Sequence, residues 1–110
     1  MSIHEECGVL GVYSRTTGDV ASLVYYGLYA LQHRGQEGCG IVVNEDGVFT
    51  SHKGLGLVSE VFTQEEMQKL PKGEIAVGHV RYGTTGGNNL SNCQPIQVNH
   101  LKGKLAVAHN

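Results

Sequence analysis

The chain has 110 residues, a net charge of −2 at pH 7 and 40% hydrophobic residues, with no tryptophan. This length suits one small domain with its own core, and the near balance of charges offers no basic surface that would indicate a nucleic-acid partner. No run approaches the ~20 apolar residues of a membrane-spanning helix, and three cysteines without a CxxC pair, behind a start that is no secretory signal, predict a reduced, cytoplasmic protein.

The first half of the chain predicts a strand, a helix and a hairpin. Residues 7–13 form a short apolar run with glycines, which indicates a buried strand. Residues 20–32 carry apolar side chains at helical spacing and follow Asp19, a favoured residue for capping a helix. Residues 38–44 and 48–53 flank the turn sequence NEDG, which is typical of a β-hairpin.

The second half is less regular. Residues 54–73 predict one or two short helices that end at Pro71. Residues 74–80 and 105–108 are predicted strands, and the first of them runs into a long polar, glycine-rich loop, RYGTTGGNNLSN. The hairpin and the many short strands favour an α+β fold in which helices pack on an antiparallel sheet.

Cys7 stands directly behind a short polar leader. A cysteine becomes a strong nucleophile only when a base or a lowered pKa activates it. The α-amino group of a protein has a pKa of roughly 7.7–8.0 and is partly neutral near pH 7. If residues 1–6 were removed, Cys7 would therefore carry both a nucleophile and its base. The alternative, which position alone favours, is a buried structural cysteine.

Four stretches together resemble a known family: CGVLGVY, LYALQHRGQEGCGI, GHVRYGTTGG and LAVAHN. They are similar to the glutamine amidotransferases with an N-terminal cysteine nucleophile, a branch of the N-terminal nucleophile hydrolases. More closely, they resemble the glutaminase domain of the amidophosphoribosyltransferases. The resemblance implies a four-layer α-β-β-α sandwich of antiparallel sheets that this chain covers in part. Residues 1–6 would be a propeptide, and residues 7–110 the N-terminal part of a type 2 glutamine amidotransferase domain.

The resemblance also implies roles for single residues. Cys7 would attack the side-chain amide of L-glutamine, form a thioester and release ammonia, while Asn110 would donate to the oxyanion of the intermediate. Arg81 would hold the substrate's α-carboxylate, which a guanidinium fork matches. Tyr82 and Thr84 would bind the substrate in a loop over residues 82–92 that closes on it. For Arg81 a surface ion pair, and for Thr84 a hydroxyl facing water, remain as alternatives.

Arg34 and Gly35 lie in the loop that borders the nucleophile in this family, and Gly35 also suits a left-handed position at the end of the helix predicted over residues 20–32. The histidines form no i, i+4 pair on a helix, so the chain predicts no metal site of its own. Magnesium, phosphoribosyl pyrophosphate and, in some family members, a 4Fe–4S cluster would bind elsewhere in the full-length protein. Such enzymes are usually homo-oligomers, and we expect neither nucleic acid nor membrane as a partner.

We expect the 110-residue chain by itself to be inactive. Glu6 would block the amine of Cys7, and the family's second oxyanion donor is a glycine that follows the position of Asn110. Two other functions remain open. One is the glutaminase domain of a different amidotransferase, of the aminosugar or asparagine synthase type. The other is a non-catalytic, truncated module.

Overall fold

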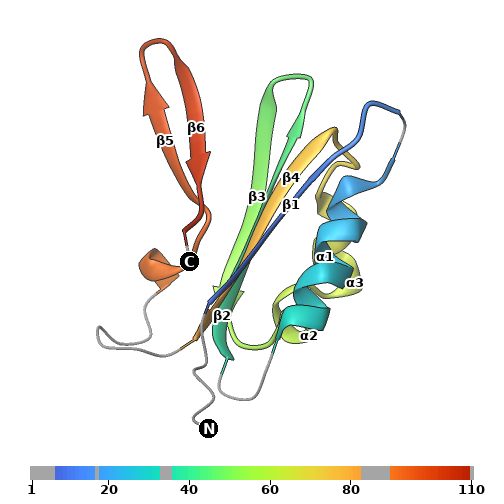
Figure 1. The fold of residues 1–110 in the computed structure, drawn as a ribbon, viewed down its shortest axis with the longest axis vertical. Coiled ribbons are helices and arrows are strands. Elements are labelled where there is room, and N and C mark those ends of the chain that lie inside the picture. Colours follow the sequence, from blue (N-terminus) through green and yellow to red (C-terminus); the bar gives the residue numbers. More distant parts are fainter. Residues whose placement is uncertain (1–6, 17, 33–35, 83–89, 110) are drawn as a thin grey trace, which may run out of the picture.

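A computed structural model describes residues 7–16, 18–32, 36–82 and 90–109 (Figure 1). Its elements are β1 (Gly8–Tyr13), α1 (Val20–Leu31), β2 (Gln36–Glu45), β3 (Val48–Leu55), α2 (Val58–Val61), α3 (Gln64–Lys69), β4 (Ile75–Tyr82), the 3₁₀ turn η1 (Leu90–Asn92), β5 (Ile96–His100) and β6 (Gly103–Val107). In the described part of the chain, no helix is both long and apolar enough to cross a membrane.

Helix α1 begins and ends at residues that the local sequence explains. The Asp19 carboxylate accepts the backbone N–H of Ser22 at 3.1 Å and thus caps the first turn. Leu31 is the last helical residue because Gln32 already has an extended backbone. The helix therefore ends before Gly35, which lies outside the described residues, and the predicted role of that glycine as its cap does not apply.

The strands form one four-stranded antiparallel sheet, with the order β1-β4-β2-β3, and one separate hairpin of β5 and β6. The predicted hairpin of β2 and β3 is confirmed. Its turn places Asp46 at φ 51° and Gly47 at φ 82°, the backbone that tight hairpin turns require and that aspartate and glycine adopt most readily. Strand β4 inserts between β1 and β2, so both of its edges are paired.

One face of this sheet is covered by the helices, and the core lies between them (Figure 1). Val24 and Leu28 of α1 are fully buried there. Gly78 of β4 lies directly beneath them, because a Cβ at this position would stand 2.5 Å from Val24 Cγ1. Successive side chains alternate between faces of a strand, so the neighbours Val77 and His79 point to the opposite side of the sheet.

The β5–β6 hairpin lies on that opposite side, away from the helices (Figure 1). Two hydrogen bonds tie it and the segment before it to β3: Lys53 Nζ donates to the Cys93 carbonyl at 3.0 Å, and Gln97 Nε2 donates to Ser51 Oγ at 2.7 Å. Helices, sheet and hairpin thus form three successive layers. The expected α+β class with antiparallel sheets is confirmed, but strand β5 was not among the predicted elements.

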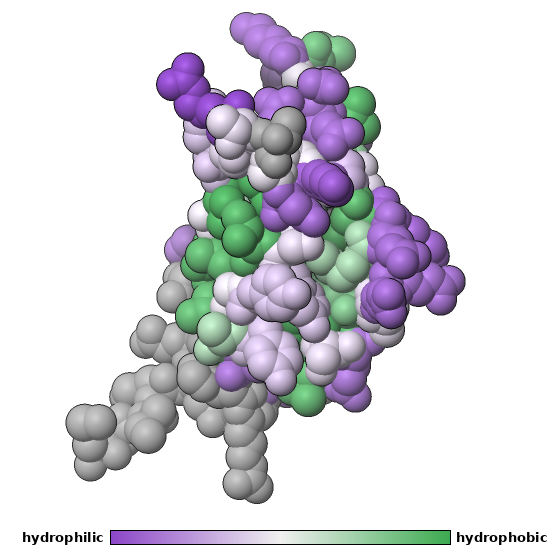
Figure 2. All heavy atoms as spheres, turned by 90° about the vertical axis from the view of Figure 1, so that its right-hand side faces the viewer, coloured by the Kyte–Doolittle hydropathy of each residue, from purple (hydrophilic) through white to green (hydrophobic). Residues whose placement is uncertain are grey.

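The outer side of α1 remains in contact with solvent. Leu23 and Tyr29 are about half exposed, at 53% and 52%, and Tyr26 is 67% exposed. Figure 2 shows this side of the molecule, where green hydrophobic residues alternate with pale and purple ones. The helix therefore has one face in the core and an aromatic face that no described residue covers.

Candidate active site

Cys7 and Arg81 lie at the same end of two neighbouring strands. Strands β1 and β4 are antiparallel, with Gly8 opposite Val80, so one further step of this register sets Cys7 opposite Arg81. Gly8 and Val80 face α1, because a Cβ on Gly8 would meet Val80 and Leu31 side chains. By alternation, Cys7 and Arg81 both point to the face that carries the hairpin.

The guanidinium of Arg81 has free hydrogen-bonding capacity. Its Nε is buried and has no hydrogen-bond partner within the described residues. The ion pairs found in that part of the chain join Glu66 to His52 and Lys69, and neither includes Arg81. A partly buried guanidinium that has an unpaired Nε and no carboxylate partner in this part of the chain is suited to an anionic ligand.

A third group of this face, His79, is completely buried, with 0% of its surface exposed. It lies two residues before Arg81 on β4 and opposite Val9 and Gly40 on the neighbouring strands. Burial lowers the pKa of His79 below its ordinary value of 6.5; the hydrogen bond with the His109 carbonyl opposes this effect, and the nearby charge of Arg81 adds to it. The imidazole is therefore neutral at pH 7.

His109, the last described residue, lies at this site. His79 Nε2 lies 3.1 Å from the carbonyl oxygen of His109, and the His109 N–H donates to Gln94 Oε1 at 2.6 Å. The segment that leads to residue 110 thus lies against the sheet face that carries Cys7 and Arg81. His79 belongs to the sequence motif GHVRYGTTGG but was not among the predicted site residues. No sequence motif pointed to Gln94.

Tyr82 requires a correction. It is the last residue of β4, and its side chain is 1% exposed on the face opposite to Arg81. Its hydroxyl donates to the Leu31 carbonyl of α1 at 3.1 Å. Alternation along the strand places the Tyr82 side chain in the core, so the loop predicted over residues 82–92 begins only after Tyr82. The role of Tyr82 in substrate binding stays a prediction. The other predicted site residues lie outside the described residues: Arg34, Gly35, Thr84 and Asn110.

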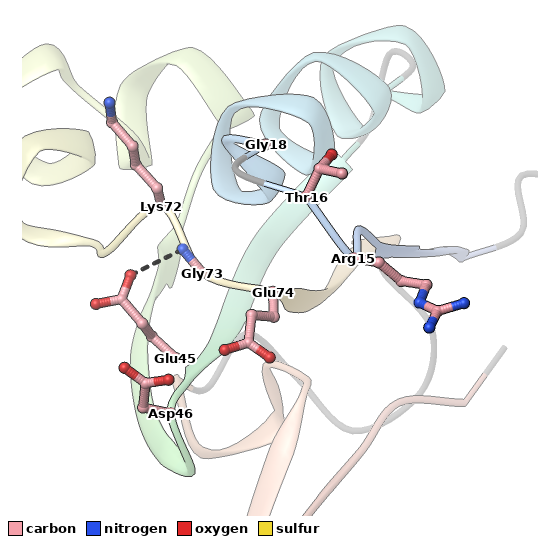
Figure 3. Close-up of a pocket in the computed structure, with 8 residues that line it drawn as sticks. All are labelled: Arg15, Thr16, Gly18, Glu45, Asp46, Lys72, Gly73 and Glu74. Atoms are coloured by element: carbon pink, nitrogen blue, oxygen red, sulfur yellow. Dashed lines mark hydrogen bonds between the residues drawn. The ribbon is translucent and has the colours of Figure 1, made fainter.

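A surface cavity of about 610 Å³ lies at the opposite end of the sheet (Figure 3). Glu45, Asp46 and Glu74 are among the residues that line it, while the Arg15 and Lys72 side chains extend away from them. Glu45 also accepts the Gly73 N–H at 3.1 Å. The cavity contains no residue of the predicted site, and among the described residues no three His, Cys, Asp or Glu side chains gather as a metal site.

Comparison with known proteins connects this geometry to a family. A scan against protein-family models finds no match. The chain is 50% identical over 104 residues to amidophosphoribosyltransferase of Methanocaldococcus jannaschii, 48% over 117 residues to that of Homo sapiens, and 48% over 109 residues to that of Bacillus subtilis. These alignments cover 94%, 100% and 98% of this chain, and 22%, 23% and 22% of the relatives.

A solved structure of glutamine phosphoribosylpyrophosphate amidotransferase from B. subtilis, complexed with ADP and GMP, has a TM-score of 0.79 and 44% identity. It is matched over 93% of this chain and 21% of its own. A second structure, described as the allosteric regulatory enzyme of purine biosynthesis, has the same TM-score at 45% identity, over 89% of this chain and 21% of its own.

This chain is similar, over nearly its whole length, to one part of the amidophosphoribosyltransferases. It spans about a fifth of the length of these relatives. The family resemblance that the four motifs predicted is confirmed, and so is the expected fold.

Proposed function

We propose that this chain is the glutaminase part of an amidophosphoribosyltransferase. It would hydrolyse L-glutamine and supply the ammonia that converts phosphoribosyl pyrophosphate to 5-phosphoribosylamine in purine biosynthesis. One feature of the structure supports the proposal: the register of β1 and β4, extended by one residue beyond Gly8 and Val80, sets Cys7 across from Arg81, whose buried Nε has no partner in the described part of the chain. The relatives share the name amidophosphoribosyltransferase. This name favours phosphoribosyl pyrophosphate as the acceptor of the ammonia over the acceptors of aminosugar or asparagine synthases.

The two side chains suit the two ends of glutamine. In glutamine, four bonds separate the α-carboxylate carbon from the side-chain amide carbon. Residues directly opposite in an antiparallel pair have Cβ atoms about 4.5–5.5 Å apart. Arg81 can therefore hold the carboxylate through its guanidinium while the amide carbon lies at the thiol of Cys7. A substrate without a free α-carboxylate would leave the cation unpaired.

Removal of residues 1–6 would free the α-amine of Cys7 as the base. This amine takes the thiol proton as sulfur attacks the amide carbon, and the carbonyl electrons move onto oxygen. Donors such as the Asn110 side chain would stabilise that oxyanion. When the C–N bond breaks, the α-ammonium returns the proton to the leaving nitrogen, so ammonia departs and a thioester remains. Water then cleaves the thioester to glutamate and restores the thiol.

The acceptor reaction belongs to the proposal for the whole protein, of which this chain matches about a fifth. Ammonia would attack C1 of phosphoribosyl pyrophosphate and displace pyrophosphate. Magnesium would neutralise the phosphates of that substrate, as it commonly does.

The decisive experiment treats the full gene product with 6-diazo-5-oxo-L-norleucine, an electrophilic analogue of glutamine, and maps the adduct by peptide mass spectrometry. We expect one adduct, on a peptide that begins at Cys7. Cys39 and Cys93, both buried, serve as internal control thiols in the same digest. An adduct on either of them, or a peptide that keeps residues 1–6 in an enzyme that hydrolyses glutamine, would contradict the proposed mechanism.

Activity assays test the acceptor separately. We expect the wild-type protein to form glutamate from glutamine, the Cys7→Ala variant to form none, and phosphoribosyl pyrophosphate with Mg²⁺ to raise the rate. With ammonium salts in place of glutamine, the Cys7→Ala variant should still release pyrophosphate. Glutaminase activity without any reaction of phosphoribosyl pyrophosphate would assign the chain to another amidotransferase.

A further inference from the structure

The segment before β5 covers two glycines near the start of β2. Gly38 has no side chain, and a Cβ on it would stand only 2.7 Å from Sγ of Cys93. A Cβ on Gly40 would likewise meet the backbone carbonyl of Gln94. The thiol of Cys93, which is completely buried, therefore occupies the space above Gly38 that a side chain would otherwise take.

This thiol lies beside Arg81. Gly38 of β2 is directly opposite Arg81 of β4, and opposite residues of paired strands face the same side of the sheet. The charge of Arg81 also reaches the thiol: burial raises the pKa of Cys93, and the nearby cations Lys53 and Arg81 oppose that rise. Cys93 therefore adjoins the guanidinium from the β2 side, whereas the extended register of β1 sets Cys7 on its other side.

Lys53 of β3 holds Cys93 in this place. Its Nζ donates to the Cys93 carbonyl at 3.0 Å, and the Cys93 thiol donates to the Gly54 carbonyl at 3.6 Å. Lys53 is opposite Gly40, which has no side chain that would stand in the way. The ion pairs found between described residues do not include Lys53, and the Cys93 carbonyl is the acceptor that its ammonium faces. The backbone and the side chain of Cys93 are thus both anchored to β3.

We propose that Cys93 is a wall that closes the β2 side of Arg81 and leaves its guanidinium open toward Cys7. The inference rests on the proposed glutaminase function, in which Arg81 binds the carboxylate of glutamine. With the β2 side closed, the carboxylate approaches from the side of Cys7 and is held in one place relative to that thiol. The wall would also exclude substrates that continue beyond the carboxylate, as a glutaminyl peptide does. Cys93 is thus a specificity-determining residue, and Lys53, which acts through it, is a positioning residue.

Kinetics of the full gene product with two substrates test this role. L-Glutamine is the expected substrate, and L-glutaminylglycine carries its carboxylate three bonds further from the side-chain amide. Cys93→Ala removes the thiol, and Lys53→Met removes the hydrogen-bond donor at similar length. In both variants we expect KM for glutamine to rise about 5- to 20-fold while kcat stays within about twofold, because the wall acts on substrate binding. The preference for glutamine over glutaminylglycine, as a ratio of kcat/KM values, should fall about tenfold.

This ratio is measured on one preparation, so a fraction of unfolded protein cancels from it. Cys93→Ser keeps the shape of the side chain and Lys53→Arg keeps a cationic donor, so both should retain most of the wild-type preference. Lys102→Met, at an exposed lysine in the turn between β5 and β6, is the matched control and should equal the wild type. In the double variant Lys53→Met/Cys93→Ala, the loss should be smaller than the product of the two single losses, since both residues act on one wall.

The outcomes that contradict the wall differ from those that contradict the proposed function. An unchanged preference in both Cys93→Ala and Lys53→Met would overturn the inference, as would a wild type that hydrolyses both substrates alike. Losses that multiply in the double variant would show that Lys53 acts apart from Cys93 and would overturn its positioning role. A wild type that does not hydrolyse glutamine at all would refute the proposed function and the wall with it.

Discussion

The three thiols of this chain differ in burial and therefore in reactivity. Burial, followed by the neighbouring Cys93, raises the pKa of Cys39 to about 12, and burial also raises the pKa of Cys93. Cys7 is only half-buried. Because the thiolate is the reactive form, iodoacetamide at pH 8 should alkylate Cys7 in the native protein and the other two only after denaturation. Mass spectrometry of the digest measures this, and native modification of Cys39 at the rate of Cys7 would contradict it.

Arg81 should act on substrate binding. Arg81→Gln removes the cation, and Arg81→Lys keeps the charge without the planar fork. Hydrogen bonds to charged groups contribute about 1.5–3 kcal/mol, so KM for glutamine should rise about 10- to 100-fold in Arg81→Gln and less in Arg81→Lys. Steady-state glutaminase kinetics provide the measurement. Arg15→Gln, at the far end of the sheet, is the matched control, and an equal rise there would argue against a specific role for Arg81.

His79 should make stability depend on pH. Its pKa in the folded protein lies below the ordinary 6.5, so between these two values the unfolded chain binds a proton that the folded chain does not. The contribution of His79 is therefore complete above pH 6.5, and the free energy of unfolding falls as the pH drops below it. The advantage of the wild type over His79→Gln should shrink between pH 8 and about pH 5 in denaturant titrations. If the difference in unfolding free energy between the wild type and His79→Gln stays constant over this pH range, the pKa of His79 is the same in the folded and unfolded states.

At the scale of elements, two glycines permit close packing on the two faces of the sheet. They lie on neighbouring strands: Gly78 of β4 is opposite Ile41, and Gly40 of β2 is opposite His79. A Cβ on Gly78 would press against Val24 and Leu28 of α1, whereas one on Gly40 would meet the backbone carbonyl of Gln94. The first glycine thus lets the helix approach, and the second lets the segment before β5 approach.

These contacts predict different effects of the same substitution. Gly78→Ala should lower the free energy of unfolding by about 1–3 kcal/mol through overpacking and leave the activity of the folded protein near wild type. Gly40→Ala should displace the Gln94 backbone from the sheet face that carries Arg81, and so lower kcat in addition to stability. Thermal melts and glutaminase assays of both variants test this. If both variants lose activity equally, the faces do not have separate roles.

Some elements were visible in local sequence and others were not. Asp19 and the apolar spacing after it marked α1, and NEDG marked the β2–β3 turn. Strand β5 had no such signal, because all of its residues are exposed and it lacks an alternation of buried and exposed positions. It forms a strand because it pairs with β6. Pairing of this kind is decided by the partner and leaves no pattern within the strand itself.

Over the whole molecule, the strands differ in how many neighbours protect them. β2 and β4 are each paired on both sides, whereas β5 and β6 pair only with each other within the described residues. We therefore expect backbone amides of β2 and β4 to exchange slowest with deuterium and those of β5 and β6 fastest. Hydrogen exchange followed by mass spectrometry measures this order. Equal protection of the hairpin and the central strands would show that the hairpin has a further partner.

The sequence by itself determined the local elements and the resemblance to the amidophosphoribosyltransferases. Its motifs around Cys7 and Arg81 carried the family resemblance, which implies a nucleophile and a carboxylate-binding group at these positions. Caps and turn residues predicted α1 and the hairpin, because such signals act over a few neighbouring residues. Only the tertiary structure decided that β4 lies between β1 and β2, which sets Arg81 across from Cys7. It also decided that Tyr82 enters the core and that His79 holds His109, since strand order and the covered face depend on contacts between residues far apart in the chain.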